Sequence, residues 1–170
     1  LTHPKEIKPM TAFTIVDFHP CHAPAISLLY HQAIQAIQHP RHNSAKKLAW
    51  SSAPRSTKHW QLRYKLNKAW LVQNAQQQIV GFIGIETQFH QRGYIDCLYV
   101  DPHFQHQGIA SLLIEHLQCW AKSQHYQRLS VDASYLSKPL FERHNFRLIK
   151  SNLRVKNNQT LAAFYLEKVL

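Results

Sequence analysis

The run from Tyr94 to Trp120, YIDCLYVDPHFQHQGIASLLIEHLQCW, constrains the fold more than any other part of the chain. Its first part, Tyr94–Val100, is rich in β-branched and aromatic residues and predicts a strand. A turn with a single glycine, Gly108, follows, and apolar residues at helical spacing then predict a helix from Gly108 to about Lys122. A strand that leads through a short turn into an amphipathic helix is typical of an α/β domain.

The rest of the chain predicts more strands than helices. We expect strands at 13–17, 69–73, 79–86, 94–100 and 128–134, a helix from Pro24 to about Pro40, two short helices in 44–66 divided at Pro54, a short helix at 138–145, and a C-terminal hairpin of strands 146–155 and 160–169 with its turn at Asn157–Asn158. This order predicts an α/β fold: a mixed, mostly antiparallel sheet of six or seven strands with helices on both faces. The 170 residues suffice for one domain, 11–170, and we interpret residues 1–10 as an N-terminal extension or a cloning remnant.

Composition indicates the cellular compartment and the classes of binding partner. The three cysteines have no C-x-x-C spacing, which favours a reducing compartment, and the chain lacks an apolar signal segment or a run able to span a bilayer, so we expect a cytoplasmic protein without a membrane partner. The net charge of +11 favours an acidic partner, although the basic residues are scattered and Lys46–Lys47 is their only adjacent pair. The pairs His103/His106 and His39/His42 are isolated, so no metal site is expected.

The glycine turn predicts an anion site. The chain has four glycines, at positions 81, 84, 93 and 108, and their spacing allows neither the G-x-G-x-x-G nor the G-x-x-x-x-G-K pattern. The pattern that remains is Q-x-x-G-x-A, Gln105–Ala110, between a strand and a helix. The first N–H groups of a helix have no intrahelical partner, and together with the helix dipole they bind phosphate groups. Gly108 has no Cβ, so an anion can approach its backbone closely.

In context the turn resembles a known family. Tyr94–Leu117 is similar to the acetyl-CoA-binding motif of the GNAT superfamily of N-acetyltransferases, and LSVDASYLSKPLFERHNF, Leu129–Phe146, resembles the next strand and helix of that family. The pairing of D-A-S with K-P-x-F-E-R resembles the YafP-like bacterial branch in particular. The resemblance implies a GNAT-like domain that moves an acetyl group from acetyl-CoA directly to an amine.

The same resemblance implies where the cofactor binds. The strand before the turn would separate from its neighbour, with pantetheine in the gap, and the turn would bind the pyrophosphate. Lys138 and Arg143 could contact phosphate, although solvated surface positions suit them equally. The cofactor-binding residues implied are Leu98, Tyr99, Val100, Gln105, His106, Gln107, Gly108, Ile109, Ala110, Ser111, Ser134, Lys138, Phe141 and Arg143.

Transfer to an amine needs a group that accepts a proton. Of the nine carboxylates, Glu86, Asp96 and Asp132 fall on strands near the expected gap. Strand alternation places Asp96 on the face of Leu98 and Val100, so we rank Asp96 first as general base and Glu86 second, either one directly or through water. For Asp132 we favour a structural role, as a carboxylate hydrogen-bonded to a loop, over the role of base.

The acid position departs from the family. Phe141 stands where many GNAT enzymes have a tyrosine, and phenylalanine cannot donate a proton. Tyr135 is the first substitute, with Ser134 and Tyr99 as others, and the coenzyme A thiolate could also leave unassisted, since a thiol pKa is about 8.5.

The prediction is therefore an acetyl-CoA-dependent N-acetyltransferase with an unidentified small-molecule or peptide amine as acceptor. Two alternatives remain open: a non-catalytic acyl-CoA-binding sensor, suggested by Phe141, and a basic nucleic-acid-binding module, suggested by the charge and disfavoured by its scatter. Acceptor choice is expected from residues 44–66 and 87–93, where Trp50, Trp60 and Tyr64, together with Trp70, could line a pocket or fill the core. The C-terminal hairpin is a plausible edge for a homodimer.

Overall fold

A computed structural model describes residues 12–88 and 92–170 of the chain, so the predicted extension at 1–10 lies outside the described residues. Its strands form one seven-stranded sheet in the order β1-β2-β3-β4-β5-β7-β6. The strands are β1 (Thr14–Asp17), β2 (Lys68–Gln73), β3 (Ile79–Ile85), β4 (Tyr94–Val100), β5 (Arg128–Ala133), β6 (Arg147–Lys156) and β7 (Gln159–Val169), and the helices are α1 (Ala23–Gln35), α2 (Ser44–Trp50), α3 (Thr57–Leu66), α4 (Ile109–Ser123) and α5 (Lys138–Arg143). The predicted fold class is confirmed, since only the β4–β5 pair is parallel.

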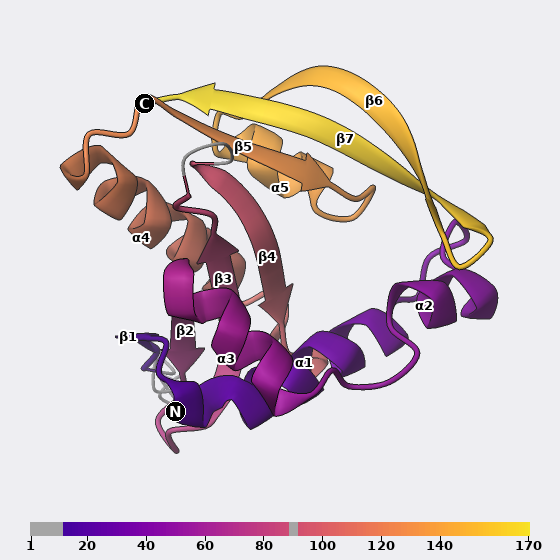
Figure 1. The fold of residues 1–170 in the computed structure, drawn as a ribbon, viewed down its shortest axis with the longest axis horizontal. Coiled ribbons are helices and arrows are strands. Elements are labelled where there is room, and N and C mark those ends of the chain that lie inside the picture. Colours follow the sequence, from indigo (N-terminus) through magenta and orange to yellow (C-terminus); the bar gives the residue numbers. More distant parts are fainter. Residues whose placement is uncertain (1–11, 89–91) are drawn as a thin grey trace, which may run out of the picture.

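Helices cover both faces of the sheet (Figure 1). On one face, α4 and α5 pack against a core that includes Trp70 and Phe141, which are 2% and 1% exposed. On the other face, α1 and α3 enclose a second core around Trp60 and Tyr64. Trp70, Trp60 and Tyr64 are therefore all core residues.

The sheet opens between β4 and β5. The two parallel strands pair only at Tyr94 with Ser130 and at Ile95 with Val131, and they diverge beyond that point (Figure 1). The separation that the resemblance implied is thus present. It leaves the edge of β4 from residue 96 to residue 100 without a β5 partner.

The β6–β7 hairpin closes the far side of this opening. Its turn reaches α2, where Lys156 Nζ donates to the Trp50 carbonyl at 2.9 Å and Asn157 Nδ2 donates to the Ala49 carbonyl at 3.3 Å (Figure 1). β6 is an edge strand with Leu153 and Val155 exposed, which is the edge expected to pair in a homodimer. The homodimer itself stays a prediction. Among the described residues, no helix combines the length and the hydropathy that crossing a bilayer requires.

A β-bulge shapes the centre of β4. Gly84 pairs with Cys97 and Ile85 with Ile95, so Asp96 is the extra residue on the bulged strand. The expectation that Asp96 shares a face with Leu98 and Val100 is therefore wrong: those two residues pack toward the α4 core, whereas Asp96 contacts Arg63 and Tyr64 of α3. An inserted residue interrupts strand alternation, and no periodicity in the sequence reveals it.

Gly84 makes room for this arrangement, and its replacement is the first test. A Cβ at position 84 would collide with Asp96 Oδ1 and with the Tyr64 hydroxyl. Because overpacking of a filled interior costs ~1–3 kcal/mol, we expect Gly84→Ala to lower the free energy of unfolding by that amount in urea titration. The control Thr14→Ala, at an exposed position of β1, should stay within ~0.5 kcal/mol of wild type. An unchanged stability of Gly84→Ala would contradict the close packing of α3 on the bulge.

Candidate functional site

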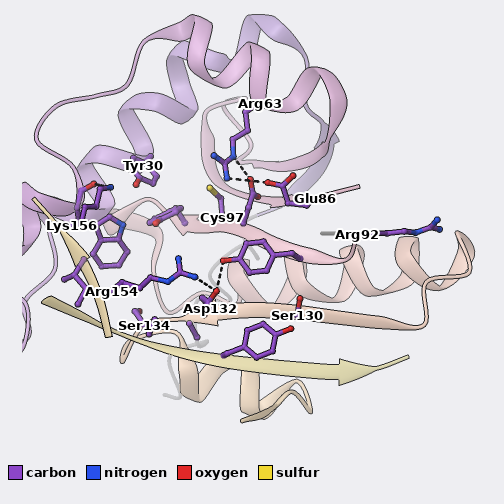
Figure 2. Close-up of a pocket in the computed structure, with 18 of the residues that line it drawn as sticks. Tyr30, Arg63, Glu86, Arg92, Cys97, Ser130, Asp132, Ser134, Arg154 and Lys156 are labelled. Carbon is purple, nitrogen blue, oxygen red and sulfur yellow. Dashed lines mark hydrogen bonds and ion pairs between the residues drawn. The ribbon is translucent and has the colours of Figure 1, made fainter. Parts of the chain in front are cut away.

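A cavity of about 1520 Å³ lies in the opening between β4 and β5. Figure 2 shows Arg63, Glu86 and Cys97 gathered on its α3 side, with Asp132 and Arg154 facing them from the β5 and hairpin side. Aromatic residues from α1, α2 and α3, including Tyr30, Trp50 and Trp60, line the same cavity. Trp50 and Trp60 line the cavity and also pack in the second core, so they take both of the roles that the sequence left open.

Two carboxylates meet on the α3 side. Asp96 forms an ion pair with Arg63 Nε and accepts a hydrogen bond from the Tyr64 hydroxyl at 3.4 Å. Glu86 Oε1 lies 3.8 Å from another nitrogen of the same guanidinium. The side chain of Asp96 is 1% exposed and that of Glu86 is 17% exposed. Both oxygens of Asp96 are therefore engaged and buried, whereas Glu86 is held less tightly and is open to the cavity.

Burial changes the acidity of both groups. It raises the pKa of Asp96, with the Arg63 guanidinium acting in the opposite direction. It also raises the pKa of Glu86, and the neighbouring Asp96 carboxylate adds to the rise. A carboxylate with a raised pKa is a stronger proton acceptor than an ordinary one, so this pair is suited to general base chemistry.

On the opposite wall, Asp132 uses one carboxylate oxygen for its contacts, and its buried Oδ1 has no hydrogen-bond partner among the described residues. Asp132 accepts a hydrogen bond from the Tyr94 hydroxyl at 3.0 Å and forms an ion pair with Arg154 of β6. Burial and the adjacent Asp132 raise the pKa of Tyr94 to about 12. These contacts fix the hairpin to β4 and β5, and the structural role of Asp132 stays a prediction.

The turn after β4 has the features of an anion site. Gly108 adopts the left-handed conformation at φ 84° and His106 at φ 61°, which turns successive N–H groups outward at the start of α4. In the described part of the chain, the N–H groups of residues 105–111 have no hydrogen-bond partner. A Cβ at Gly108 would meet nothing within 4 Å, so the space above the turn is open. This geometry fits a pyrophosphate group.

The other residues implied for the cofactor have mixed surroundings. Ser134 lines the cavity, and Arg143 is exposed on α5. The Ser111 hydroxyl lies 2.9 Å from His144 Nε2, and Lys138 forms an ion pair with Glu142 at 2.7 Å. Phe141 packs against Phe146 in the core and does not line the cavity.

Tyr135 lies apart from the two carboxylates. Its ring packs against Phe164 at 4.8 Å between centroids, and the Arg41 guanidinium stands 4.1 Å from its centroid. It lines a separate cavity of about 420 Å³ with Lys46 and Leu153. The structure therefore does not bring Tyr135 together with Asp96 and Glu86.

Three charged pocket residues were missed from the sequence. Arg63 of α3 pairs with Asp96, and Arg154 and Lys156 come from the C-terminal hairpin. The one available signal was the aromatic content of residues 44–66, which suggested a wall without naming its charged members. Cys97, predicted to be buried, is buried, and its burial raises the thiol pKa.

Comparisons with known proteins agree with this geometry. The family model described as "Acetyltransferase (GNAT) domain" matches residues 39–165. The uncharacterized N-acetyltransferase YafP of Escherichia coli (strain K12) is 31% identical over 143 residues, which cover 83% of this chain and 85% of that protein.

Solved structures share the fold at lower identity. A GCN5-related N-acetyltransferase from Rhodopseudomonas palustris superposes with a TM-score of 0.84 at 21% identity, over 96% of this chain and 99% of that one. The acetyltransferase yncA from Salmonella typhimurium, solved with acetyl-CoA, gives 0.72 at 17% identity over 93% and 94% of the two chains. A phosphinothricin acetyltransferase from Sinorhizobium meliloti in complex with acetyl-CoA gives 0.73 at 14% identity over 93% and 88%.

Proposed function

The chain belongs to the GNAT acetyltransferases, in the YafP-like branch, and is an acetyl-CoA-dependent N-acetyltransferase; on this premise we propose that an acceptor amine attacks the thioester directly in the cavity between β4 and β5. The observation that carries the proposal is the position of two features on one strand. The bulge of β4 holds a carboxylate pair, and its C-terminal end leads into the turn with free N–H groups.

The described residues fit acetyl-CoA. The N–H groups of residues 105–111 would bind the pyrophosphate, and the unpaired edge of β4 would form hydrogen bonds with the pantetheine amides. When bound, acetyl-CoA supplies the thioester carbon that the amine attacks. Backbone groups thus orient the donor.

We assign proton acceptance to Glu86. The sequence ranked Asp96 first, but both oxygens of Asp96 are occupied by Arg63 and Tyr64, and its side chain is 1% exposed. Glu86 faces the cavity with a raised pKa. In this arrangement Asp96 holds Arg63, and its charge adds to the rise in the pKa of Glu86 that burial causes.

The thiolate leaves without a tyrosine donor from α5. Phe141 is buried and has no hydroxyl, and Tyr135 lines a different cavity. The other two hydroxyl candidates, Ser134 and Tyr99, do line this cavity. Because a thiol pKa is about 8.5, a thiolate is a fair leaving group near neutral pH without a proton donor.

A thiol-release assay tests the function. Purified protein with acetyl-CoA and a panel of small-molecule and peptide amines should release coenzyme A thiol only in the presence of an amine, with the acetylated amine identified by mass spectrometry. Binding of acetyl-CoA without transfer to any amine would favour the acyl-CoA sensor instead.

A further inference from the structure

The cavity has a second charged region that the acetyl-transfer chemistry does not use. Arg55, from the segment between α2 and α3, and Lys156, at the end of β6, line it together with His42. The three residues, here called the basic cluster, surround two aromatic rings. The His42 ring lies 5.9 Å from the Trp50 ring, Lys156 donates to the Trp50 carbonyl, and the Arg55 guanidinium lies 5.9 Å from the centroid of Tyr30.

The cavity's carboxylates do not neutralise the basic cluster. Asp96 and Glu86 pair with Arg63, and Asp132 pairs with Arg154. Within residues 12–88 and 92–170, neither Arg55 nor Lys156 forms an ion pair with a carboxylate. Exposed Arg55 and half-buried Lys156 therefore line one wall of the cavity without a carboxylate counter-charge from the described residues.

Burial acts on two members of the basic cluster, Lys156 and His42. Burial lowers the pKa of Lys156, and the nearby Arg55 charge lowers it further. His42 is 7% exposed, and its Nδ1 has no hydrogen-bond partner among the described residues. Burial, His39 and Lys46 lower the pKa of His42, so its ring is neutral at pH 7. An anion in contact with this wall would give both cations a counter-charge, in addition to the Trp50 carbonyl that Lys156 already contacts, and could accept a hydrogen bond from the imidazole.

We propose that the acceptor is an amine that also carries an oxyanion, a carboxylate or a phosphate ester, and that the basic cluster binds this oxyanion while the amine faces Glu86. This inference rests on the proposed function and adds the class of acceptor. The basic cluster and Glu86 line the same cavity from different elements, so an acceptor with separated charges can contact both. A cationic acceptor such as a polyamine would meet uncompensated positive charge there.

The basic cluster is separate from the implied cofactor site in its structural elements. Arg55 and Lys156 belong to the α2–α3 segment and the hairpin, whereas the pyrophosphate site is the turn between β4 and α4. Ser27 of α1 donates to the Arg55 carbonyl, which fixes the backbone independently of the Arg55 side chain. Arg55→Gln can therefore remove the charge without removing this anchor.

Kinetics with matched acceptors test the inference. The series consists of ω-amino carboxylates and aminoalkyl phosphates of increasing chain length, each compared with the corresponding amide or alcohol. We expect kcat/KM to be at least ~10-fold higher for the best anionic acceptor than for its neutral counterpart. The carboxylate and phosphate arms identify the oxyanion. Arg55→Gln and Lys156→Gln should each reduce the preference while leaving the KM for acetyl-CoA unchanged, and Lys58→Gln, an exposed charge outside the cavity, should leave both unchanged.

Two outcomes overturn the inference: equal kcat/KM for anionic and neutral acceptors, or a raised KM for acetyl-CoA in Arg55→Gln with the preference intact. Binding of the N-acetylated products by calorimetry separates it from the proposed function. If no amine is acetylated, the proposed function fails, yet tighter binding of the anionic product than of its amide, lost in Arg55→Gln, would still support the basic cluster. No such preference in binding would overturn it as well.

Discussion

Glu86→Gln is expected to lower kcat by ~10²–10⁴-fold, the range that general base catalysis contributes. Glutamine has nearly the size of glutamate but does not accept a proton in this pH range. The side chain is 17% exposed, and its contact with Arg63 is long at 3.8 Å, so its loss should disturb the fold little. The KM for acetyl-CoA should stay unchanged, because the implied cofactor site is on the turn after β4. Steady-state thiol release with a good acceptor measures both constants.

The pH dependence of kcat/KM tests whether Glu86 is the general base. Burial and Asp96 raise the pKa of Glu86 from the ordinary 4.5, so the carboxylate becomes protonated, and kcat/KM falls, at a higher pH than for an exposed glutamate. This acid limb should keep its position when the acceptor is exchanged for one with a different amine pKa, and it should disappear in Glu86→Gln. A limb that follows the pKa of the acceptor would report the amine and not the enzyme.

Two variants control for structure. Glu142→Gln makes the same change at an ion pair on α5 outside the cavity and should leave kcat unchanged. Asp96→Asn removes the buried partner of Arg63, which costs ~3–5 kcal/mol when one charge of a buried pair is left alone, so its loss of activity should accompany a loss of stability. If Glu86→Gln keeps the wild-type kcat and the acid limb of the pH profile, Asp96 and not Glu86 is the general base.

The contrast between these carboxylates shows what the sequence could determine. The strand, turn and helix around Gly108 can be predicted because neighbouring residues specify each of them. Alternation indicates the strand, a glycine that can adopt a left-handed conformation indicates the turn, and helical spacing indicates the helix. The bulge at Asp96 is also local, but it breaks the alternation that locates side chains, so Asp96 was placed on the wrong face.

Long-range pairing accounts for the remaining misses. Arg63 lies 33 residues from Asp96, and Lys156 lies 106 residues from Trp50, so only the packed sheet brings either pair together. Phe141 illustrates the opposite case. A single local departure from the family pattern raises doubt about a tyrosine acid at this position, whereas the burial of Phe141 against Phe146 comes from the packing of α5.

Acetyl-CoA at about a hundred times its dissociation constant should stabilise the wild-type protein by ~2.7 kcal/mol, and Gly108→Glu should abolish this effect. In a domain of this size the wild-type rise corresponds to roughly 5–10 °C in Tm. The N–H groups around Gly108 have no partner in the described chain, and the space above them is open. A glutamate there would fill the space and place a negative charge where the pyrophosphate binds.

Strain must be separated from charge in this variant. Gly108 has φ 84°, so any side chain there is strained, and Gly108→Glu should itself unfold at a lower temperature. Asparagine tolerates this conformation better and carries no charge, so Gly108→Asn should keep part of the acetyl-CoA effect. Acetyl-pantetheine, which lacks the pyrophosphate, should bind wild type and Gly108→Glu equally. A full acetyl-CoA shift in Gly108→Glu would mean that the phosphates bind elsewhere, with the basic residues of the cavity as the next site to examine.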